Sequence, residues 1–430
     1  MSSRRRRFVF TMWEGGGTLP PELGVARRII ERGHHVHVIG DPTIRERAQA
    51  IGADFTAWSR APHRTSLDPS DDLFRDWEVR NPLTMLRNAR DRFMAGPAAA
   101  FATDTAEVID AVDPEALVAD TMMLGTIIAG QAAGLPVAVL VPNIWMAPTK
   151  GVPPVGPGFA PARTPIGRLR DAAVRTAAKR LFDGGLPALN AARADFGLPP
   201  IASFWDQVLT ADRILVLTSA AFDFAATHVP RNVAYVGPIL DDPQWVEPLA
   251  PPAPGSSGPL DDPLVLVGFT SNFQDHGAQL RRVVDALSEL PVRAVVTLGQ
   301  MLDTDEVTPT DNVTVVRSAP HGSILQEAAL AVTHCGHGTT LKALAAGVPL
   351  VCMPMGRDQN DTAARVVHRG AGLRLSPSAP TAEIRRAIDT VLTDGSYRDN
   401  ARRLAAAIAT EHRSVDVGAE LEELFEPVSP

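Results

Sequence analysis

Cysteine, lysine and long apolar runs are all scarce in this 430-residue sequence. The only cysteines are Cys335 and Cys352, which excludes a disulfide framework or a four-thiolate metal site, and we expect two buried, reduced thiols. No stretch approaches the roughly 18 consecutive apolar residues that a membrane-spanning helix needs. The first apolar run, Phe8–Trp13, is too short for the core of a signal peptide. These absences predict a cytoplasmic protein without a membrane partner.

A concentrated basic surface is also missing. The net charge is −8, whereas a sequence-independent nucleic-acid binder needs clustered cations to displace counterions. Lysine occurs only at Lys150, Lys179 and Lys342 beside abundant arginine and alanine, which is typical of a GC-rich bacterial genome. The one basic run, Arg4 to Arg7, precedes the first predicted strand and is interpreted as a solvated tail. We therefore expect no nucleic acid as a partner.

The length predicts two domains, because a single core of 430 residues would be oversized. Dense proline, glycine and serine between Asp241 and Pro263 cannot continue a helix or a central strand. We therefore expect a first domain at 1–240, a linker at 241–262, a second domain at 263–412 and a C-terminal helix at 413–430 that returns to the first domain.

Short β-rich runs alternate with helical patterns in both predicted domains, as in α/β proteins. The expected strands are 8–12, 36–39, 116–120, 137–141, 214–217, 264–268, 293–298, 313–316, 330–333 and 350–353, and the clearest helices of the second half are 277–289 and 340–346. This alternation predicts two doubly wound parallel sheets, each covered by helices on both faces.

Two irregular zones, about 60–80 and 143–165, are rich in proline, glycine and large apolar side chains. Long loops of this kind often line binding sites. The alternative is that their aromatic side chains only cap the edges of the sheet. The side chains in question are Trp58, Phe74, Trp77, Trp145, Met146 and Phe159.

The strongest local signal follows the predicted strand Leu330–Thr333, where the sequence reads HCGHGTT before a helix. Gly336 and Gly338 allow the backbone to approach a ligand, and a helix that begins at Thr339 or Thr340 offers free N–H groups to a pyrophosphate. His334 and the Thr339 hydroxyl add side-chain donors. A tight structural turn would explain the glycines equally well.

The next strand ends in an acid and an amide, Asp358 and Gln359. A carboxylate accepts hydrogen bonds and an amide both donates and accepts, which is the combination that sugar hydroxyls need. A helix-capping aspartate with a solvated glutamine remains the alternative.

The run from Ala319-Pro-His321 through HCGHGTTLKALAAGVPLVCMPMGRDQNDTAARV resembles the donor-binding signature of the inverting nucleotide-sugar glycosyltransferases of family one. It is most similar to the bacterial natural-product branch, which decorates macrolides, enediynes and aromatic polyketides. The segment GGGTLPPELGVARRIIERGHHV resembles that family's N-terminal loop and helix. The resemblance implies a GT-B fold, two Rossmann-like domains facing a central cleft. It also implies a metal-independent reaction with no cofactor, in which the nucleotide sugar is a co-substrate.

The resemblance also assigns site residues. His334, Gly336, Gly338 and Thr339 would hold the diphosphate, and Asp358 and Gln359 would hold the sugar hydroxyls. Ser271, next to Thr270, matches a phosphate-side serine region, and Arg317 to Ala319 match the segment that meets the base. The acceptor would lie on the first domain, near Trp77, Trp145 and Met146.

The catalytic base departs from the family pattern, because Thr18 stands where many relatives carry a histidine. A threonine hydroxyl has too high a pKa to accept a proton at neutral pH. The carboxylate that orients this histidine is matched by Asp120. We expect Asp120 to act as the base directly, or through water and Thr18, unless the acceptor is acidic enough to need little help. His276 as the base and Asp120 as a structural cap are the alternatives.

Two further departures concern the nucleoside. Lys342 stands where relatives often carry a glutamate that holds the ribose hydroxyls, which favours a thymidine diphosphate sugar or, alternatively, an outward-facing lysine. Ser318 replaces an aromatic residue that stacks on the base in plant relatives, and the guanidinium of Arg317 can substitute for that ring.

We therefore expect an inverting O-glycosyltransferase that moves a sugar, and more specifically a deoxysugar, from a thymidine or uridine diphosphate donor to a small apolar natural product. The alternatives are a nucleotide-sugar epimerase and a relative that binds without turnover. A nicotinamide dehydrogenase is excluded, because no Gly-x-Gly-x-x-Gly motif with a ribose-binding acid is present. The sequence does not decide whether the protein forms a homodimer.

Overall fold

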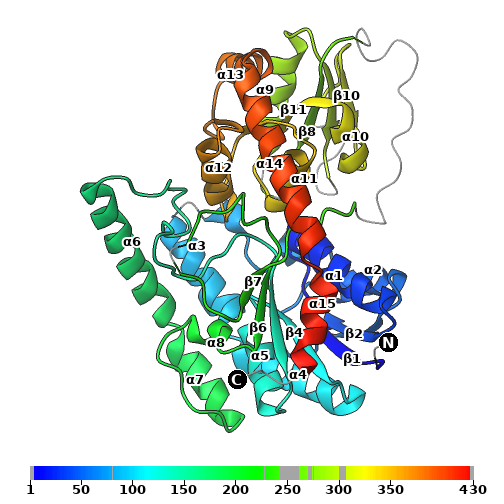
Figure 1. Cartoon of the computed structure of the whole chain (residues 1–430), viewed down its shortest axis with the longest axis vertical. Helices are drawn as coiled ribbons and strands as arrows, with labels where there is room; N and C mark the ends of the chain where they lie inside the picture. Colours follow the sequence, from blue (N-terminus) through cyan, green and yellow to red (C-terminus); the bar gives the residue numbers. More distant parts are fainter. Residues whose placement is uncertain are drawn as a thin grey trace.

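The computed structural model describes residues 4–79, 81–226, 228–242, 261–269, 274, 276–299 and 307–426. In this part of the chain two parallel sheets are present, one from each half of the sequence (Figure 1). The prediction of two doubly wound parallel sheets is therefore confirmed. Most of the predicted linker, 243–260, lies outside the described residues.

The first sheet has the strand order β3-β2-β1-β4-β5-β6-β7, and every neighbouring pair is parallel. Its strands are β1 (Arg7–Thr11), β2 (His35–Gly40), β3 (Asp54–Ala57), β4 (Ala116–Asp120), β5 (Val137–Val141), β6 (Arg213–Val216) and β7 (Val233–Tyr235). The central strands β4 and β5 are buried at every position, as continuous apolar runs predict for a sheet covered on both faces. The direction of winding reverses between β1 and β4, so ligands are expected beyond their carboxyl ends.

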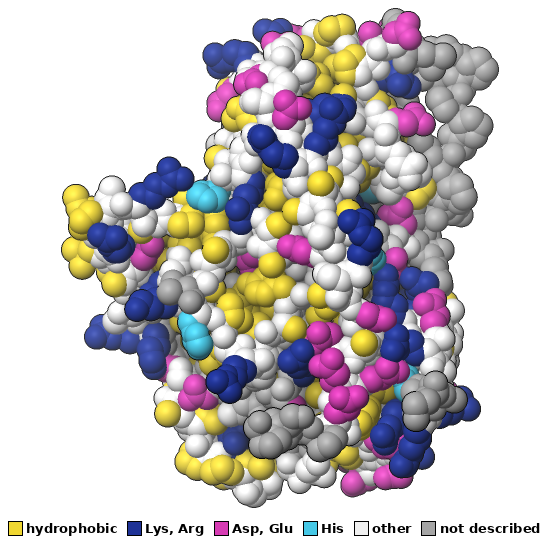
Figure 2. Space-filling view, viewed as in Figure 1, with side chains coloured by type: hydrophobic (Ala, Val, Ile, Leu, Met, Phe, Trp, Pro, Cys, Tyr) yellow, Lys and Arg dark blue, Asp and Glu magenta, His cyan; other side chains and the backbone are white. Residues whose placement is uncertain are grey.

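The helices that cover this sheet are α1 (Leu19–Glu31), α2 (Arg45–Ala50), α3 (Pro82–Ala89), α4 (Ala98–Val112), α5 (Leu124–Ala132), α6 (Pro165–Asp183), α7 (Leu186–Asp195) and α8 (Asp206–Leu209). The short helices η1 (Gly16–Thr18) and η4 (Asp76–Glu78) lie in the loops that follow β1 and β3. Helix α6 projects from the body of the protein, and apolar side chains gather at its projecting end (Figure 2). There Ile166 and Leu169 are 81% and 71% exposed.

The second sheet has the strand order β10-β9-β8-β11-β12-β13, again with parallel neighbours. Its strands are β8 (Leu264–Gly268), β9 (Arg293–Thr297), β10 (Val313–Val316), β11 (Ala328–Thr333), β12 (Leu350–Cys352) and β13 (Gly372–Arg374). The accompanying helices are α9 (Gly277–Ser288), α10 (His321–Glu327), α11 (His337–Ala345), α12 (Gln359–His368) and α13 (Thr381–Thr393). The winding reverses between β8 and β11, which places a second expected ligand edge beside His334.

The C-terminal helices connect the two halves. Helix α14 (Gly395–Ser414) packs on α11 of the second half and runs toward the first half, where α15 (Val417–Glu422) packs on α1 (Figure 1). Glu422 pairs with Arg32 and accepts a hydrogen bond from His34 at 2.8 Å. Glu420 pairs with Arg213 at the start of β6. The tail thus adds polar contacts between the end of the chain and the first sheet.

The expected strands match the observed ones to within two residues, but the helix after β11 begins earlier than expected. It starts at His337 rather than at Thr339 or Thr340, because Gly336 already has the backbone conformation of an N-cap. Both cysteines are buried and free, as expected. In the residues that the structure describes, no helix is long and apolar enough to cross a membrane.

Candidate active site

The carboxyl ends of β1 and β4 in the first sheet and of β8 and β11 in the second lie on either side of one contact region. Helix η1, which contains Thr18, packs against α11, which follows the glycine-rich loop. His337, the first residue of α11, forms a 2.8 Å hydrogen bond with Thr218 of the first half. The two segments that the sequence singled out, one from each half, are therefore neighbours.

His334 follows β11 and is 7% exposed. Its ring stacks on Phe269 at a centroid distance of 6.1 Å, and it forms a hydrogen bond with the main chain of Gly268. Burial, together with the nearby His276 and Arg357, lowers the pKa of His334 to about 3. The imidazole is therefore neutral at physiological pH and acts as a hydrogen-bond donor or acceptor rather than as a cation.

The glycine-rich loop is shaped by this imidazole. A Cβ on Gly336 would lie 2.4 Å from Nε2 of His334, so only glycine fits beneath the ring. Cys335, between them, has a φ of 66°, a left-handed conformation that costs a non-glycine residue about 1–3 kcal/mol. By contrast, a Cβ on Gly338 would meet nothing within 4 Å. The N–H groups at the start of α11 have no side-chain cap, and this end of a helix attracts anions.

Gln359 and Asp358 lie at the start of α12, as expected. The Oε1 atom of Gln359 accepts hydrogen bonds from the N–H groups of Met355 and Gly356, at 2.8 and 3.1 Å. Its Nε2 atom donates to Oε1 of Gln274 at 2.9 Å. The amide therefore holds its own loop together, and a sugar would have to share or replace these bonds. Burial raises the pKa of Asp358.

Arg357 connects this loop to the first half of the chain. Its Nε and Nη2 atoms donate to the two carboxylate oxygens of Asp76 at 2.7 and 2.9 Å. Gln274 adds a third hydrogen bond to Asp76 at 3.0 Å. Burial would raise the pKa of Asp76, but the Arg357 guanidinium and these bonds outweigh it and the pKa is lowered. Asp76 is therefore an ionised contact from the irregular zone 60–80 to the predicted sugar-binding loop.

The other irregular zone also contacts α12. Asp361 accepts hydrogen bonds from the N–H groups of Gly156 and Gly158 at 2.6 and 3.1 Å. One turn further along, Arg365 donates to Asp223 at 2.6 Å, and both side chains are 2% exposed. The loop with Gly156 and Gly158 is thus anchored to α12, and the loop with Asp76 is anchored to Arg357, just before that helix begins.

An acidic group lies at the carboxyl edge of the first sheet. Asp120 ends β4, is 1% exposed, and accepts a hydrogen bond from the N–H of Met122 through Oδ1 at 2.6 Å. Glu22 and Trp13 lie near the same carboxyl group and both act on it. Burial raises the pKa of Asp120 despite these bonds. Thr18 is half-buried at the N-cap of α1, so the structure brings the two predicted catalytic residues to the same edge.

His276, the alternative base, lies on the opposite side of the contact region. It is 1% exposed, precedes α9 and stacks on Phe269 at 6.1 Å with the rings nearly parallel. Phe269 thus has His276 and His334 as stacking partners. The position belongs to the donor side of the site, so His276 supports the surroundings of His334 and is poorly placed to serve an acceptor bound on the first half.

Lys342 has a structural partner that the sequence did not reveal. It donates to Asp242 at 2.5 Å and its side chain is only 14% exposed, so the expectation of an outward-facing lysine is wrong. Asp242 also accepts a hydrogen bond from the N–H of Gly322 at 2.9 Å. Nearby, Ala319 is buried and Arg317 is exposed. Thr270 and Ser271 lie outside the described residues.

The predicted acceptor-lining residues divide into two kinds. Trp77 and Met146 are half-buried, so part of each side chain is open to a ligand. Trp145 is 2% exposed, packs in the core of the first half and donates from Nε1 to Thr149 at 2.7 Å. The role of Trp145 in the acceptor site therefore stays a prediction, and its indole is packed in the core.

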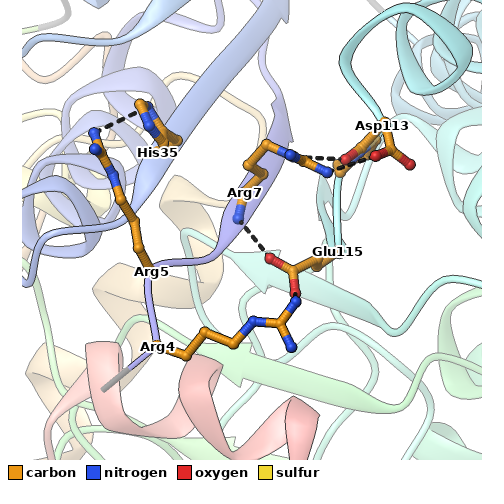
Figure 3. A pocket seen from close by; sticks show the side chains of 7 residues that line it. Arg4, Arg5, Arg7, His35, Asp113 and Glu115 are labelled. Carbon is orange, nitrogen blue, oxygen red and sulfur yellow. Dashed lines mark hydrogen bonds and ion pairs between the residues drawn. The ribbon is translucent and has the colours of Figure 1, made fainter. Parts of the chain in front are cut away.

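A cavity of about 440 Å³ lies at the opposite, amino edge of the first sheet (Figure 3). Arg7 donates to Asp113 (Figure 3). Arg6 pairs with Glu115 at 2.6 Å, so the predicted solvated tail is ion-paired. Ligands of doubly wound sheets bind at the carboxyl edge, and this cavity is therefore not assigned to the chemistry. A second cavity, of about 520 Å³, borders Met355 and lies beside the loop after β12. Among the described residues, no group of three or more metal-binding side chains is present.

Sequence reasoning did not find Glu22, Asp76 or Gln274. Glu22 carried a signal, since it lies four residues after Thr18 on a predicted helix and therefore shares its face. Asp76 and Gln274 carried none, because their partners come from the other half of the chain.

Known proteins resemble this chain over most of its length. Residues 281–424 match the family model described as Erythromycin biosynthesis protein CIII-like, C-terminal domain. The chain is 29% identical over 420 residues to 4'-demethylrebeccamycin synthase of Lentzea aerocolonigenes, covering 95% of this chain and 97% of the relative. It is 27% identical over 420 residues to demethyllactenocin mycarosyltransferase of Streptomyces fradiae, covering 95% and 84%.

Solved structures share the whole fold. The glycosyltransferase of kitacinnamycin superposes with a TM-score of 0.75 at 21% identity, covering 98% of this chain and 99% of the other. The spinosyn rhamnosyltransferase SpnG, complexed with thymidine diphosphate, gives a TM-score of 0.65 at 20% identity, covering 97% and 99%. Identities this low establish the fold alone. The chain therefore has the GT-B fold, its residues 281–424 match the family model, and over nearly its whole length it is similar to natural-product glycosyltransferases.

Proposed function

We propose that the protein is an inverting O-glycosyltransferase that moves a sugar, by preference a deoxysugar, from a thymidine diphosphate donor to a hydroxyl of a small apolar natural product. The observation that carries this proposal is the pairing of two edges. His334 and the start of α11 form a neutral, anion-accepting edge, and Asp120 with Thr18 forms an acidic edge beside it. The first edge would stabilise the leaving group, and the second would remove the proton of the acceptor.

The donor diphosphate would lie at the start of α11. There the free N–H groups and the helix dipole offset the charge that develops on the leaving phosphate. The open space above Gly338 admits the phosphate. The neutral His334 has a single N–H, which would donate to the phosphate in place of the main chain of Gly268 and would add no charge. Asp358 and Gln359, at the start of α12, would contact the sugar hydroxyls.

The chemical step would take place between the two edges. The acceptor hydroxyl oxygen attacks the anomeric carbon and forms the new C–O bond. The bond from that carbon to the phosphate oxygen breaks, and the nucleoside diphosphate leaves with the electron pair. The acceptor proton passes to Asp120, directly or through water and the hydroxyl of Thr18, and then to solvent. One displacement inverts the configuration, so an α-linked donor yields a β-glycoside.

The thymidine preference rests on Lys342. Its ammonium group pairs with Asp242 and cannot accept hydrogen bonds from ribose hydroxyls, which matters less for a pentose without a 2'-hydroxyl. The complex of SpnG with thymidine diphosphate is consistent with such a donor. The apolar acceptor rests on Trp77 and Met146, together with the natural-product names of the sequence relatives.

A panel of thymidine and uridine diphosphate sugars assayed with polyketide and phenolic acceptors tests the proposal. We expect a glycoside whose anomeric configuration, determined by NMR, is opposite to that of the donor. Sugar interconversion without transfer would indicate an epimerase, and binding without turnover would indicate a non-catalytic relative. Retention of configuration would reject the single displacement.

A further inference from the structure

A second buried acid lies beside the proposed base. Glu22 is on α1, one turn after Thr18, and is 1% exposed, as is Asp120. Neither oxygen of Glu22 forms a hydrogen bond of ordinary geometry with the described residues, and the same holds for Oδ2 of Asp120, Nε1 of Trp13 and Oγ1 of Thr18. Five unsatisfied polar atoms therefore share one interior site, and a buried polar group normally finds a partner.

The two carboxyl groups act on each other. Asp120 is the charged group that acts on Glu22, both through its charge and through a side-chain hydrogen bond. Two neighbouring buried carboxylates cannot both be ionised, because each would raise the energy of the other in a low-dielectric interior. The pair therefore holds a proton at neutral pH.

The surroundings decide which acid carries that proton. Burial, and then the charge of Asp120, raises the pKa of Glu22 well above its usual range. Burial also raises the pKa of Asp120, but the hydrogen bond from the N–H of Met122 and the neighbouring side chains of Glu22 and Trp13 oppose the rise. Asp120 thus has three groups that stabilise its negative charge, and Glu22 has none. The proton belongs on Glu22.

The other charged groups at this edge are engaged elsewhere. Helix α5, packed against β4, carries no acidic or basic side chain. The remaining groups have partners of their own: the Glu14 side chain pairs with Arg47, Asp41 accepts from the main-chain N–H of Glu14, Arg28 pairs with Asp241, His337 bonds to Thr218 and Lys342 pairs with Asp242. Among the described residues, none of these cations is paired with Asp120, and the hydrogen bond from Glu22 takes the place of a countercharge.

We propose that Glu22, in its protonated form, donates a hydrogen bond to Asp120 and keeps it ionised as the general base, at the site where the resembling family places an imidazole. Glu22 is a positioning residue, since the acceptor proton ends on Asp120 while Glu22 keeps its own. The proposal rests on the proposed transfer reaction and deepens it, because it explains how the site works with Thr18 instead of histidine.

The test compares Glu22→Gln with Glu22→Leu in the pH profile of kcat at saturating substrates. Glutamine keeps an N–H donor toward Asp120, so the acid limb should stay at its wild-type pH or move below it. Leucine removes the donor, so the acid limb should move to higher pH by about one unit or more, and activity should recover in alkaline buffer. Removing one member of a buried charged pair destabilises a fold, so the urea midpoint of each variant is measured, and Glu22→Gln, which keeps the donor, is the variant that tests the proposal if Glu22→Leu does not fold. Glu31→Gln and Glu31→Leu, on the exposed face of the same helix, are the matched controls and should leave the profile unchanged.

An infrared spectrum supplies a readout that does not depend on turnover. Burial raises the pKa of Asp41 to about 7, so Asp41 contributes a carboxyl band to both proteins at neutral pH. The wild-type minus Glu22→Gln difference spectrum should nevertheless show the loss of one protonated-carboxyl band. A difference spectrum without that loss, or a Glu22→Leu profile that does not move, overturns the role of Glu22. A wild type that transfers no sugar to any acceptor would instead reject the proposed function. The infrared result on the protonation of Glu22 does not depend on that outcome.

Discussion

The neutral charge of His334 leads to the most direct test of the donor site. With a pKa of about 3 instead of 6.5, the free energy that favours the neutral ring is about 5 kcal/mol. A diphosphate would have to supply that energy to bind an imidazolium. We therefore expect one hydrogen bond from a neutral donor to a charged acceptor, worth about 1.5–3 kcal/mol.

Removing this bond should weaken donor binding about 10- to 150-fold in His334→Ala. His334→Gln keeps an N–H donor and should recover part of the loss, which separates the lost bond from the cavity that alanine leaves. The assay is titration calorimetry with an intact nucleotide sugar in the absence of acceptor. Such a donor has no phosphate group that ionises near neutral pH, so the protein's own titration can be seen. His412→Ala, on the exposed surface of α14, is the control.

The pH dependence of donor affinity distinguishes a neutral His334 from a cationic one. A ring whose pKa is lowered to about 3 stays neutral from about pH 5 upward, so affinity should not change through pH 6.5 on account of His334. A cationic histidine would instead lose affinity as the pH rises past its pKa. A tenfold fall in affinity between pH 5.5 and 7.5 that disappears in His334→Ala, but not in His412→Ala, would refute the neutral assignment.

Three further outcomes are expected. Asp120→Asn should lower kcat by about 10²–10⁴-fold at saturating substrates with donor affinity unchanged in calorimetry, and an intact kcat would show that Asp120 is not the base. Asp76→Asn leaves Arg357, whose side chain is 27% exposed, without its countercharge. It should destabilise the fold by about 1–3 kcal/mol, measured as a lower urea midpoint. An unchanged midpoint would show that the Asp76–Arg357 ion pair does not stabilise the fold. Lys342→Gln introduces an acceptor for ribose hydroxyls and should shift the kcat/KM ratio toward uridine donors, and an unchanged ratio would remove Lys342 from nucleoside selection.

Most of the fold, and the segment that we propose as the donor site, could be recognised from local sequence. Strands such as Val137–Val141 are continuous apolar runs, which only a sheet covered on both faces can bury. The HCGHGTT segment was recognisable because its strand, turn and helix are adjacent in the chain. Helix α11 starts at His337, earlier than the sequence predicts, because Gly336 lies against the His334 ring. Spacing alone does not reveal this contact.

Other properties depended on groups that are far apart in the sequence. Trp145 could not be distinguished from Trp77 by composition, and only packing places the first in the core and leaves the second half-buried. Lys342 lies 100 residues from Asp242, so its ion pair was invisible in the sequence.

The sequence by itself determined the two parallel sheets, the donor segment from His334 to Gln359 and the departure at Thr18, because each depends on neighbouring residues and on periodicity. The tertiary structure alone decided the protonation states and partners: a neutral His334, a carboxyl pair of Glu22 and Asp120, and an Asp76 bound to Arg357. The physical reason is that burial and charge–charge contacts set a pKa, and both arise only when distant segments of the chain are packed together.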